Sequence, residues 1–574
     1  MADAEPTRLR RREIPAHRLP STLHPVVARV LASRGITDAD ALGVELRDLL
    51  PPDGLRGMGP AVALVVDAIR ARRRIVVAGD YDADGATGVA VAVLGLRRLG
   101  AATVDYVVPN RLTMGYGLSP ALAQEAARDG GGLLITVDNG IASLAGVETA
   151  RALGLQVLVT DHHLPGATLP CADALINPNQ PGCTFASKHL AGVGVMFYLL
   201  LAVRARLRAD GAYTGGVAEP NLGELLDLVA LGTVADLVRL DHNNRILVTA
   251  GLARIRAGRA RPGVRALLEV AGRRESELTA TDLGFVLGPR INAAGRLDDI
   301  RIGIRCLLSD DATQAAQLAH ELDHINRLRR EMQAQMNESA VDQLTAGEHA
   351  ETHGLCLFDA DWHEGVVGLV ASRLRELANR PACAFARAQE AGVLKGSARS
   401  VPGLHLRDVI AAIDAASPGL ILRFGGHAMA AGLSLAESDL PQFRAAFDLA
   451  CRAHLTPAQL ERVLETDGPL DRHELVLATA HALERAGPWG QGMPEPLFED
   501  VFEVASVRPV GRDQSHVRYR LRRPDGGEIV AVDFGGAVRA CGQGRVRVAY
   551  ALSINRWQGS ESLELRVAHL EPAS

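Results

Sequence analysis

The residues best suited to chemistry lie between Asp80 and Asp84, where three aspartates occupy alternate positions. The β-branched run Ile75–Val77 precedes them and predicts a buried parallel strand, and the small apolar residues that follow predict a helix packed closely on the sheet. Ligands of open α/β sheets bind at the carboxyl ends of strands. Three carboxylates there repel one another and lose solvation, so a divalent cation is the simplest way to stabilise them. The alternative, an acidic turn with solvated side chains, stays open for these residues alone.

Polar side chains follow three more apolar segments. They are Asp138 after Leu133–Val137, then Asp161, His162 and His163 after Val157–Thr160, and Asp236 after Leu225–Val234. Taken singly, the two histidines could be a polar loop pair and Asp236 a surface or helix-end residue. We interpret the segments as successive strands of one sheet, so the repetition favours a shared metal site. Carboxylate oxygens with one imidazole suit Mn²⁺ or Mg²⁺, and the nitrogen ligand favours Mn²⁺.

The elements that must position these residues form an α/β pattern. From Val62 to about Leu200, β-rich runs alternate with amphipathic helical segments, which predicts a parallel sheet covered on both faces. A helical periodicity without Gly or Pro over residues 311–346 predicts a long connecting helix. A smaller α/β unit is expected after it, and five short alternating strands beyond residue 500 predict a small Greek-key barrel of the OB type. The predicted fold class is therefore a multidomain α/β protein with boundaries at 1–45 (an N-terminal arm packed on the first domain), 46–310, 311–346, 347–458 and 459–574.

Composition limits the function classes. The chain has 574 residues, 47% hydrophobic and 22% charged, with a net charge of −5, so a nucleic-acid surface must be a local basic groove. In the segment 517–523, arginines alternate with Val, Tyr and Leu, which gives one cationic strand face or simply a solvated one. The seven cysteines are scattered and never in CxxC spacing, which favours a reducing compartment. No apolar stretch of a secretion signal or membrane span is evident, and we expect a cytoplasmic protein without membrane contact.

The ordered set of motifs resembles the DHH phosphoesterase superfamily and, within it, the RecJ family of single-strand-specific 5′→3′ DNA exonucleases. The four motifs that carry the resemblance are Asp80-Tyr81-Asp82-Ala83-Asp84-Gly85, Asp138-Asn139-Gly140, Asp161-His162-His163 and Gly232-Thr233-Val234-Ala235-Asp236. Further marks are Gly115-Tyr116-Gly117-Leu118, Gly288-Pro289-Arg290-Ile291-Asn292, Ser397-Ala398-Arg399 and Phe424-Gly425-Gly426-His427. The resemblance covers roughly residues 50–570 and implies a DHH domain, a DHHA1 domain and an OB domain in that order.

The resemblance also implies roles for individual residues. Asp82, Asp84, Asp138, His162 and Asp236 would be metal ligands, with Asp138 bridging two ions. Asp80 would ligate metal or support the ligands, His163 would orient the site or the phosphate, and Asp161 would hold a histidine or the loop. The substrate contacts would be Arg111, Ser397 and Arg399 at the 5′-phosphate, and Arg290, Asn292 and His427 at the nucleotide at or next to the cut. Arg296 would grip phosphate oxygens from a Gly-rich turn, and Gly425 and Gly426 would permit close approach of the backbone to the strand.

Two ions in such a site would support phosphodiester hydrolysis without a covalent intermediate. The implied activity is the stepwise release of 5′-mononucleotides from single-stranded DNA, in repair and recombination. A single-strand-binding protein and a RecQ-like helicase are the expected partners. Two alternatives remain at this point: an oligonucleotide or cyclic-dinucleotide phosphoesterase of the DHH type, and a non-catalytic DNA-binding relative.

Overall fold

The computed structural model describes residues 7–110, 114–346, 352–511, 514–523, 526–539, 541–557 and 559–573. The chain divides into two compact units. The larger comprises Arg11–Asn326 and Thr466–Ser574, and the smaller comprises Met1–Arg10 and Arg327–Glu465. None of the described helices combines the length and apolar character needed to cross a lipid bilayer.

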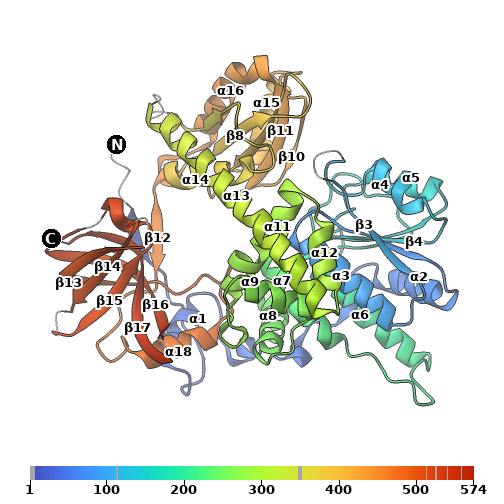
Figure 1. Cartoon of the computed structure of the whole chain (residues 1–574), viewed down its shortest axis with the longest axis horizontal. Helices are drawn as coiled ribbons and strands as arrows, with labels where there is room; N and C mark the ends of the chain where they lie inside the picture. The colour runs from blue at the N-terminus through green and yellow to red at the C-terminus, as the bar shows by residue number, and fades with distance from the viewer. Residues whose placement is uncertain are drawn as a thin grey trace. The chain divides into compact units, whose positions relative to one another are not determined.

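The larger unit contains the predicted parallel sheet (Figure 1). Its strands, in spatial order, are β3 (Val104–Val107), β2 (Ile75–Ala78), β4 (Leu133–Val137), β5 (Gln156–Thr160) and β6 (Ala174–Ile176), all parallel. The chain runs from β2 to β3 on one side and returns to place β4 on the other side of β2. The crevice for ligands in such a sheet lies at this reversal, between the carboxyl ends of β2 and β4.

Helices cover both faces of this sheet, because its strands are apolar on both faces. Val76, Leu134 and Val157 belong to an apolar cluster with residues of α4 (Pro120–Ala127) and α5 (Leu144–Ala152). The alternate positions, such as Val77 and Ile135, pack in the main core with α2 (Met58–Arg70), α3 (Ala83–Arg98) and α6 (Gly192–Ala209). Figure 1 shows α4 and α5 together on one side of the sheet.

The fourth apolar segment is a helix, which corrects our interpretation of Leu225–Val234 as a strand. It forms α7 (Leu226–Ala235), which packs against α3, α6 and α8 (His242–Arg256). Every residue from Leu226 to Val234 is buried, so the segment is apolar all round. A continuous apolar run does not distinguish a buried strand from a buried helix, which explains the error. Asp236 consequently lies at a helix end instead of a strand end.

The remaining helices lead to a long connector. They are α9 (Pro262–Val270), α10 (Ala280–Asp282), a π-helical turn η6 (Leu283–Leu287), α11 (Gly288–Leu297), α12 (Arg301–Leu308) and α13 (Ala312–Ala346). The 35 residues of α13 confirm the predicted long helix, which begins in the larger unit and ends in the smaller one.

The smaller unit contains a mixed sheet. Its order is β10 (Arg423–Gly426), β11 (Ala430–Ala436), β9 (Val393–Arg399), β8 (Ala382–Arg387) and β7 (Leu355–Phe358). Only β7 and β8 are parallel among these neighbours. Helices α14 (Val367–Ala378), α15 (Leu406–Ala416) and α16 (Leu440–His454) accompany it, which confirms a second α/β domain.

Five strands of the larger unit close into the predicted barrel (Figure 1). They are β13 (Phe498–Val510), β14 (His516–Arg522), β15 (Glu528–Asp533), β17 (Ser560–Pro572) and β16 (Arg545–Trp557). Helix α18 (Leu477–Ala486) packs against β16 and β17. The other short elements are β1 (Arg8–Arg11), paired with β12 (Val463–Thr466), α17 (Pro457–Leu460), and η1 (Ala39–Leu42), η2 (Leu46–Asp48), η3 (Pro52–Gly54), η4 (Leu222–Leu225), η5 (Glu275–Glu277), η7 (Glu437–Asp439) and η8 (Gly536–Arg539).

The N-terminal arm makes contacts that the sequence did not predict. Its helix α1 (Pro25–Ala32) packs on α18, and Arg34 forms a two-point ion pair with Asp467 at 2.7 and 3.0 Å. Both side chains are almost fully buried, with 1% and 2% exposure. The arm therefore contacts the part of the chain that leads into the barrel. It also contacts the first domain as expected, because Arg245 of α8 donates to the Ala41 carbonyl at 3.3 Å.

The outer face of β14 is less cationic than its arginines suggest. Val517, Tyr519 and Leu521 point into the barrel and the arginines between them are exposed, as the alternation predicts. Each of these arginines lies near a glutamate: Arg518 near Glu564 at 4.0 Å, Arg520 near Glu528 at 3.9 Å, and Arg522 near Glu503 at 3.4 Å. The face is accordingly balanced in charge.

Candidate active site

The aspartates after β2 are held by the start of α3. Asp82 is the N-cap residue, and its Oδ1 accepts a hydrogen bond from the Gly85 N–H at 3.0 Å. A Cβ at Gly85 would lie 2.7 Å from the backbone nitrogen and oxygen of Asp80, so only glycine permits this tight turn. The positive end of the α3 dipole also favours carboxylates here.

Asp84 is held by a second helix. Its carboxylate accepts hydrogen bonds from the backbone N–H groups of Gly192 at 2.6 Å and Val193 at 2.9 Å, at the N-terminus of α6. Burial, and next the charge of Asp82, raise the pKa of Asp84 to about 7. Two backbone donors are not enough to offset the loss of solvation, so this carboxylate needs a further positive neighbour.

Asp138 occupies a strained position directly after β4. Its φ is +65°, a left-handed conformation that non-glycine residues rarely adopt and that is common at functional sites. A Cβ on Gly192 would lie 2.5 Å from Cβ of Asp138, so the α6 terminus approaches as closely as it can. Burial, then the charges of Asp84 and Asp82, raise the pKa of Asp138 well above its ordinary value.

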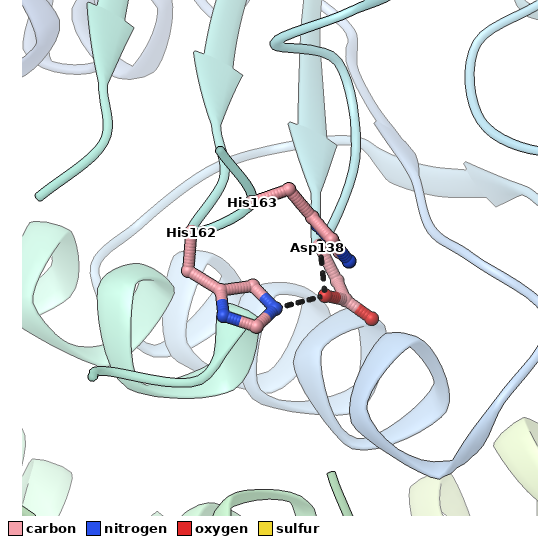
Figure 2. Close-up of side chains that lie close together, drawn as sticks. All are labelled: Asp138, His162 and His163. Carbon is pink, nitrogen blue, oxygen red and sulfur yellow. Dashed lines mark hydrogen bonds and ion pairs between the residues drawn. The ribbon is translucent and has the colours of Figure 1, made fainter. Parts of the chain in front are cut away.

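His162 brings three carboxylates together. Its Nε2 lies 3.0 Å from Oδ1 of Asp138, 3.5 Å from Oδ2 of Asp236 and 3.9 Å from Oδ2 of Asp84. Figure 2 shows His162 and His163 both directed toward the Asp138 carboxylate. Burial, and then the charge of Asp84, raise the pKa of Asp236 well above its usual range. The Asp236 carboxylate at the end of α7 therefore lies close to the Asp84 and Asp138 carboxylates, around the Nε2 atom of His162.

Asp161 positions the two histidines through contacts with the His162 backbone and the His163 ring. Its Oδ1 accepts from the His162 N–H at 2.7 Å and lies 2.8 Å from Nδ1 of His163, and its Oδ2 accepts from the Ile141 N–H at 2.8 Å. Burial alone would raise the pKa of Asp161, but the hydrogen bond and charge of His163 outweigh it and lower this pKa. Burial would lower the pKa of His163, but its bond to Asp161 raises it.

The donor atoms of these residues fit divalent metal ions. Three overlapping groups each place their ligand atoms within 4.8 Å of one another: Asp80 with Asp82 and Asp138, Asp84 with His162 and Asp236, and Asp138 with His162 and His163. Asp138 belongs to two of the groups, as a bridging ligand would. Oxygen donors with one or two imidazoles match Mn²⁺ or Mg²⁺ better than zinc or copper.

Two of the predicted substrate residues in the larger unit contact protein groups. Asn292 Oδ1 accepts from the Ala83 N–H at 2.7 Å, directly beside the acidic loop. Arg290 donates to Asp323 of α13 at 3.0 Å and to the Val286 carbonyl at 2.7 Å. Arg296 lies in the last turn of α11. Arg111 lies outside the described residues.

The other predicted substrate residues lie together in the smaller unit. Ser397 and Arg399 are both on β9, and the Arg399 guanidinium donates to the Ser397 hydroxyl at 2.9 Å. Gly425 of β10 pairs with Gly432 of β11, which in turn pairs with Ser397. Gly426 follows in β10, and the exposed His427 is in the turn to β11. Because Gly425 and Gly432 carry no side chains, the backbone of the sheet is accessible next to Ser397.

Comparison with known proteins gives three family models along the chain. They are the DHH family N-terminal domain over residues 74–233, the DHHA1 domain over 351–453 and the RecJ OB domain over 466–569. The single-stranded-DNA-specific exonuclease RecJ of Dickeya dadantii is 49% identical over 99% of this chain and 99% of its own. The chain belongs to the RecJ family.

Solved RecJ structures support the same fold and metal chemistry. RecJ from Thermus thermophilus in complex with Mn²⁺ matches with a TM-score of 0.78 at 33% identity, over 96% of this chain and 76% of that one. The same protein in complex with Mg²⁺ matches with a TM-score of 0.74 at 31% identity, with the same coverage. The acidic and imidazole groups of this RecJ-family chain are positioned to hold divalent ions of this kind.

Several residues of this RecJ-family site were missed by sequence reasoning. The Tyr116 hydroxyl donates to the Asp138 carbonyl at 3.3 Å and lies 3.2 Å from Nε2 of His163. Asn177 donates to the His163 carbonyl at 2.9 Å and Asn179 to the His162 carbonyl at 2.6 Å. Tyr116 stands between two glycines in a motif already noted, whereas nothing in the Asn-Pro-Asn segment indicated a role in holding the histidine loop.

Proposed function

We propose that this chain is a metal-dependent exonuclease that hydrolyses single-stranded DNA from the 5′ end and releases 5′-mononucleotides. One observation carries the proposal: the acidic and imidazole groups converge into three overlapping sets of metal donors, two of which share Asp138. Such a cluster is too negative to be stable without cations. Membership of a family whose curated relative is named a single-stranded-DNA-specific exonuclease supports the substrate.

Asp82, Asp84, Asp138, His162 and Asp236 would hold two ions, with Mn²⁺ favoured and Mg²⁺ as the alternative, and Asp80 would support or complete the set. When bound, the pair supplies an acidified water and charge stabilisation of the leaving oxygen. The chain itself contributes positioning, because the N–H groups of α6 hold Asp84 in place. His163 Nδ1 lies 2.8 Å from Oδ1 of Asp161, and this contact outweighs burial and raises the pKa of His163. The protonated imidazole would offer its Nε2–H to a phosphate oxygen.

The polarity of cleavage would come from the smaller unit. Ser397 and Arg399, adjacent on β9, would bind the 5′-phosphate, because a guanidinium and a hydroxyl can grip phosphate oxygens together. Arg111 would share that task, while Gly425 and Gly426 would permit close approach of the backbone to the strand. Arg290, Asn292 and His427 would contact the nucleotide at or next to the cut, and Arg296 would grip phosphate oxygens. The contact of Asn292 with Ala83 supports a further role in holding the metal loop.

The proposal extends to the cellular setting. We assign the chain to DNA repair and recombination in the cytoplasm, with a single-strand-binding protein and a RecQ-like helicase as partners. The domain limits would be 46–310 for DHH, 347–458 for DHHA1 and 459–574 for OB, with 1–45 as an arm and 311–346 as the connector. Three family models at 74–233, 351–453 and 466–569 support this order.

Digestion of a single strand labelled at either end tests the activity. The expected result is release of labelled mononucleotide only from the 5′-labelled strand, faster with a 5′-phosphate, in Mn²⁺ or Mg²⁺ and not with chelator. Mononucleotide released first from the 3′-labelled strand would refute the polarity. The Asp82→Ala variant should bind the strand without cutting it, and retained cleavage would refute the metal assignment.

The same assay separates the two alternatives. A DHH phosphoesterase for dinucleotides would hydrolyse a dinucleotide much faster than a long strand. A non-catalytic relative would bind DNA and cleave neither. The presence of all the proposed ligands within one cluster argues against the second alternative.

A further inference from the structure

Two tyrosines lie beside the metal cluster. Tyr81 stands between Asp80 and Asp82 in the acidic loop, and Tyr116 comes from the segment between β3 and α4. Their rings meet edge to face, with centroids 6.2 Å apart and planes at 80°. Tyr116 meets the His163 ring in the same way, at 5.6 Å and 77°. Three rings from three separate segments thus form a row at the site, which we call the aromatic row.

Tyr116 is held in place and is nevertheless open to solvent. Its hydroxyl donates to the Asp138 carbonyl at 3.3 Å and lies 3.2 Å from Nε2 of His163. Nearly half of the residue, 48%, is exposed. It is the most open of the seven tyrosines, since Tyr198, Tyr519 and Tyr550 are fully buried and the rest are partly covered. The side chain is therefore ordered at its polar end without being needed to fill a core.

A tyrosine that is ordered at its hydroxyl and nearly half exposed, next to the proposed cleavage site, is placed to contact a nucleobase. In a nucleotide, a single sugar separates the base from the phosphate. The Tyr116 hydroxyl contacts the backbone of Asp138, so the Tyr116 ring is similarly close to the position where a phosphate would bind. Aromatic rings bind bases of any sequence, because every base has a π-face.

We propose that Tyr116, in T-shaped contact with Tyr81, is a stacking platform for a base of the nucleotides next to the cleaved bond. This inference rests on the proposed exonuclease function and deepens it by naming a residue that contacts a nucleobase. Stacking on Tyr116 holds the terminal nucleotides in register with the metal cluster and does so without selecting a sequence.

Strands that lack a single base test the platform. The substrates are 5′-phosphorylated oligothymidylates, either intact or with one abasic residue at the first, second or third position, digested in Mn²⁺. The readout is the ratio of kcat/KM for the intact strand to that for each abasic strand. This ratio cancels any general loss of activity in a variant. For the wild type, one position should give a ratio of about ten, within the range for loss of one base–aromatic stack.

The variants assign that ratio to the ring. Tyr116→Ala should bring it close to one, whereas Tyr116→Phe should keep it, because the phenyl ring remains when the hydroxyl is lost. Tyr213→Ala, a tyrosine remote in sequence and partly covered, is the matched control and should keep the wild-type ratio. If a variant cleaves too slowly, the same ratio is read from dissociation constants measured by fluorescence anisotropy.

Two results would overturn the inference: a wild-type ratio near one at all three positions, or an unchanged ratio in Tyr116→Ala. Failure of the proposed function looks different, because the wild type would then cleave none of the strands.

Discussion

Replacing Asp236 with Asn should stabilise the metal-free protein at alkaline pH while it abolishes nuclease activity. Burial and the neighbouring charges raise the pKa of Asp236 and of Asp84 above the ordinary value of 3.8. A carboxyl whose pKa is raised by folding binds its proton more tightly in the folded state. The wild-type protein without metal therefore loses stability as the pH rises above about 4, and for Asp84 the loss continues to about 7.

The magnitude follows from the spacing of the charges. The ligand atoms of Asp84, His162 and Asp236 lie within 4.8 Å of one another. Two unit charges at this separation repel by about 3 kcal/mol at an effective dielectric constant of about 20. Because 20% of the Asp236 side chain is exposed, solvent reduces this to about 2 kcal/mol. The unfolding entropy grows with the number of residues, so for the larger unit, which holds Asp236, this gain corresponds to a rise in Tm of roughly 2 °C.

Thermal unfolding with chelator, compared at about pH 8.5 and about pH 4, measures the effect. The variant should unfold at a higher temperature than the wild type at the alkaline pH and at nearly the same temperature at the acidic pH. It should show no cleavage of a labelled strand in Mn²⁺, since the isosteric amide preserves shape and removes a charged ligand. An Asp236→Asn protein that is less stable at pH 8.5, or that still degrades DNA, would refute the electrostatic reasoning.

Three further outcomes are expected. Asn292→Ala removes the side chain that accepts a hydrogen bond from the acidic loop. It should raise the Mn²⁺ concentration needed for half-maximal activity several-fold, whereas saturating Mn²⁺ should restore much of the rate. An unchanged Mn²⁺ dependence would contradict this. Arg34→Ala should lower the free energy of unfolding, measured by urea denaturation, by about 3–5 kcal/mol, because the variant leaves the Asp467 carboxylate buried without its partner. A loss below about 1 kcal/mol would contradict this prediction. Addition of Mn²⁺ should raise the wild-type Tm more at pH 8 than at pH 5, because the ligands must be deprotonated to bind, and an equal rise at both pH values would argue against carboxylate ligands.

The strand-end part of the site was predictable because its rules are local. Short β-branched runs such as Ile75–Val77 and Leu133–Val137 form buried parallel strands, and parallel strands end at one edge of a sheet. Residues that directly follow those strands must then gather at that edge. The same local pattern, alternation at every second residue, predicted the barrel strands and the exposed arginines of β14.

The remainder of the site depends on contacts between residues far apart in the chain. Asp84 is hydrogen-bonded to backbone groups of Gly192 and Val193, more than a hundred residues later, and no sequence pattern connects them. The segment before Asp236 is buried on all sides, so its apolar residues show no periodicity. Its sequence therefore could not distinguish a helix from a strand. The position of Tyr116 depends on contacts of its hydroxyl with Asp138 and His163, which are more than twenty residues away in the sequence.

The most direct test of the central claim is anomalous diffraction from crystals of this chain soaked in Mn²⁺. The account predicts two manganese peaks, one within reach of Asp84, His162 and Asp236 and the other beside Asp80 and Asp82, with the Asp138 carboxylate touching both. Crystals that show no manganese at this cluster, or show it bound away from Asp138, would contradict the account.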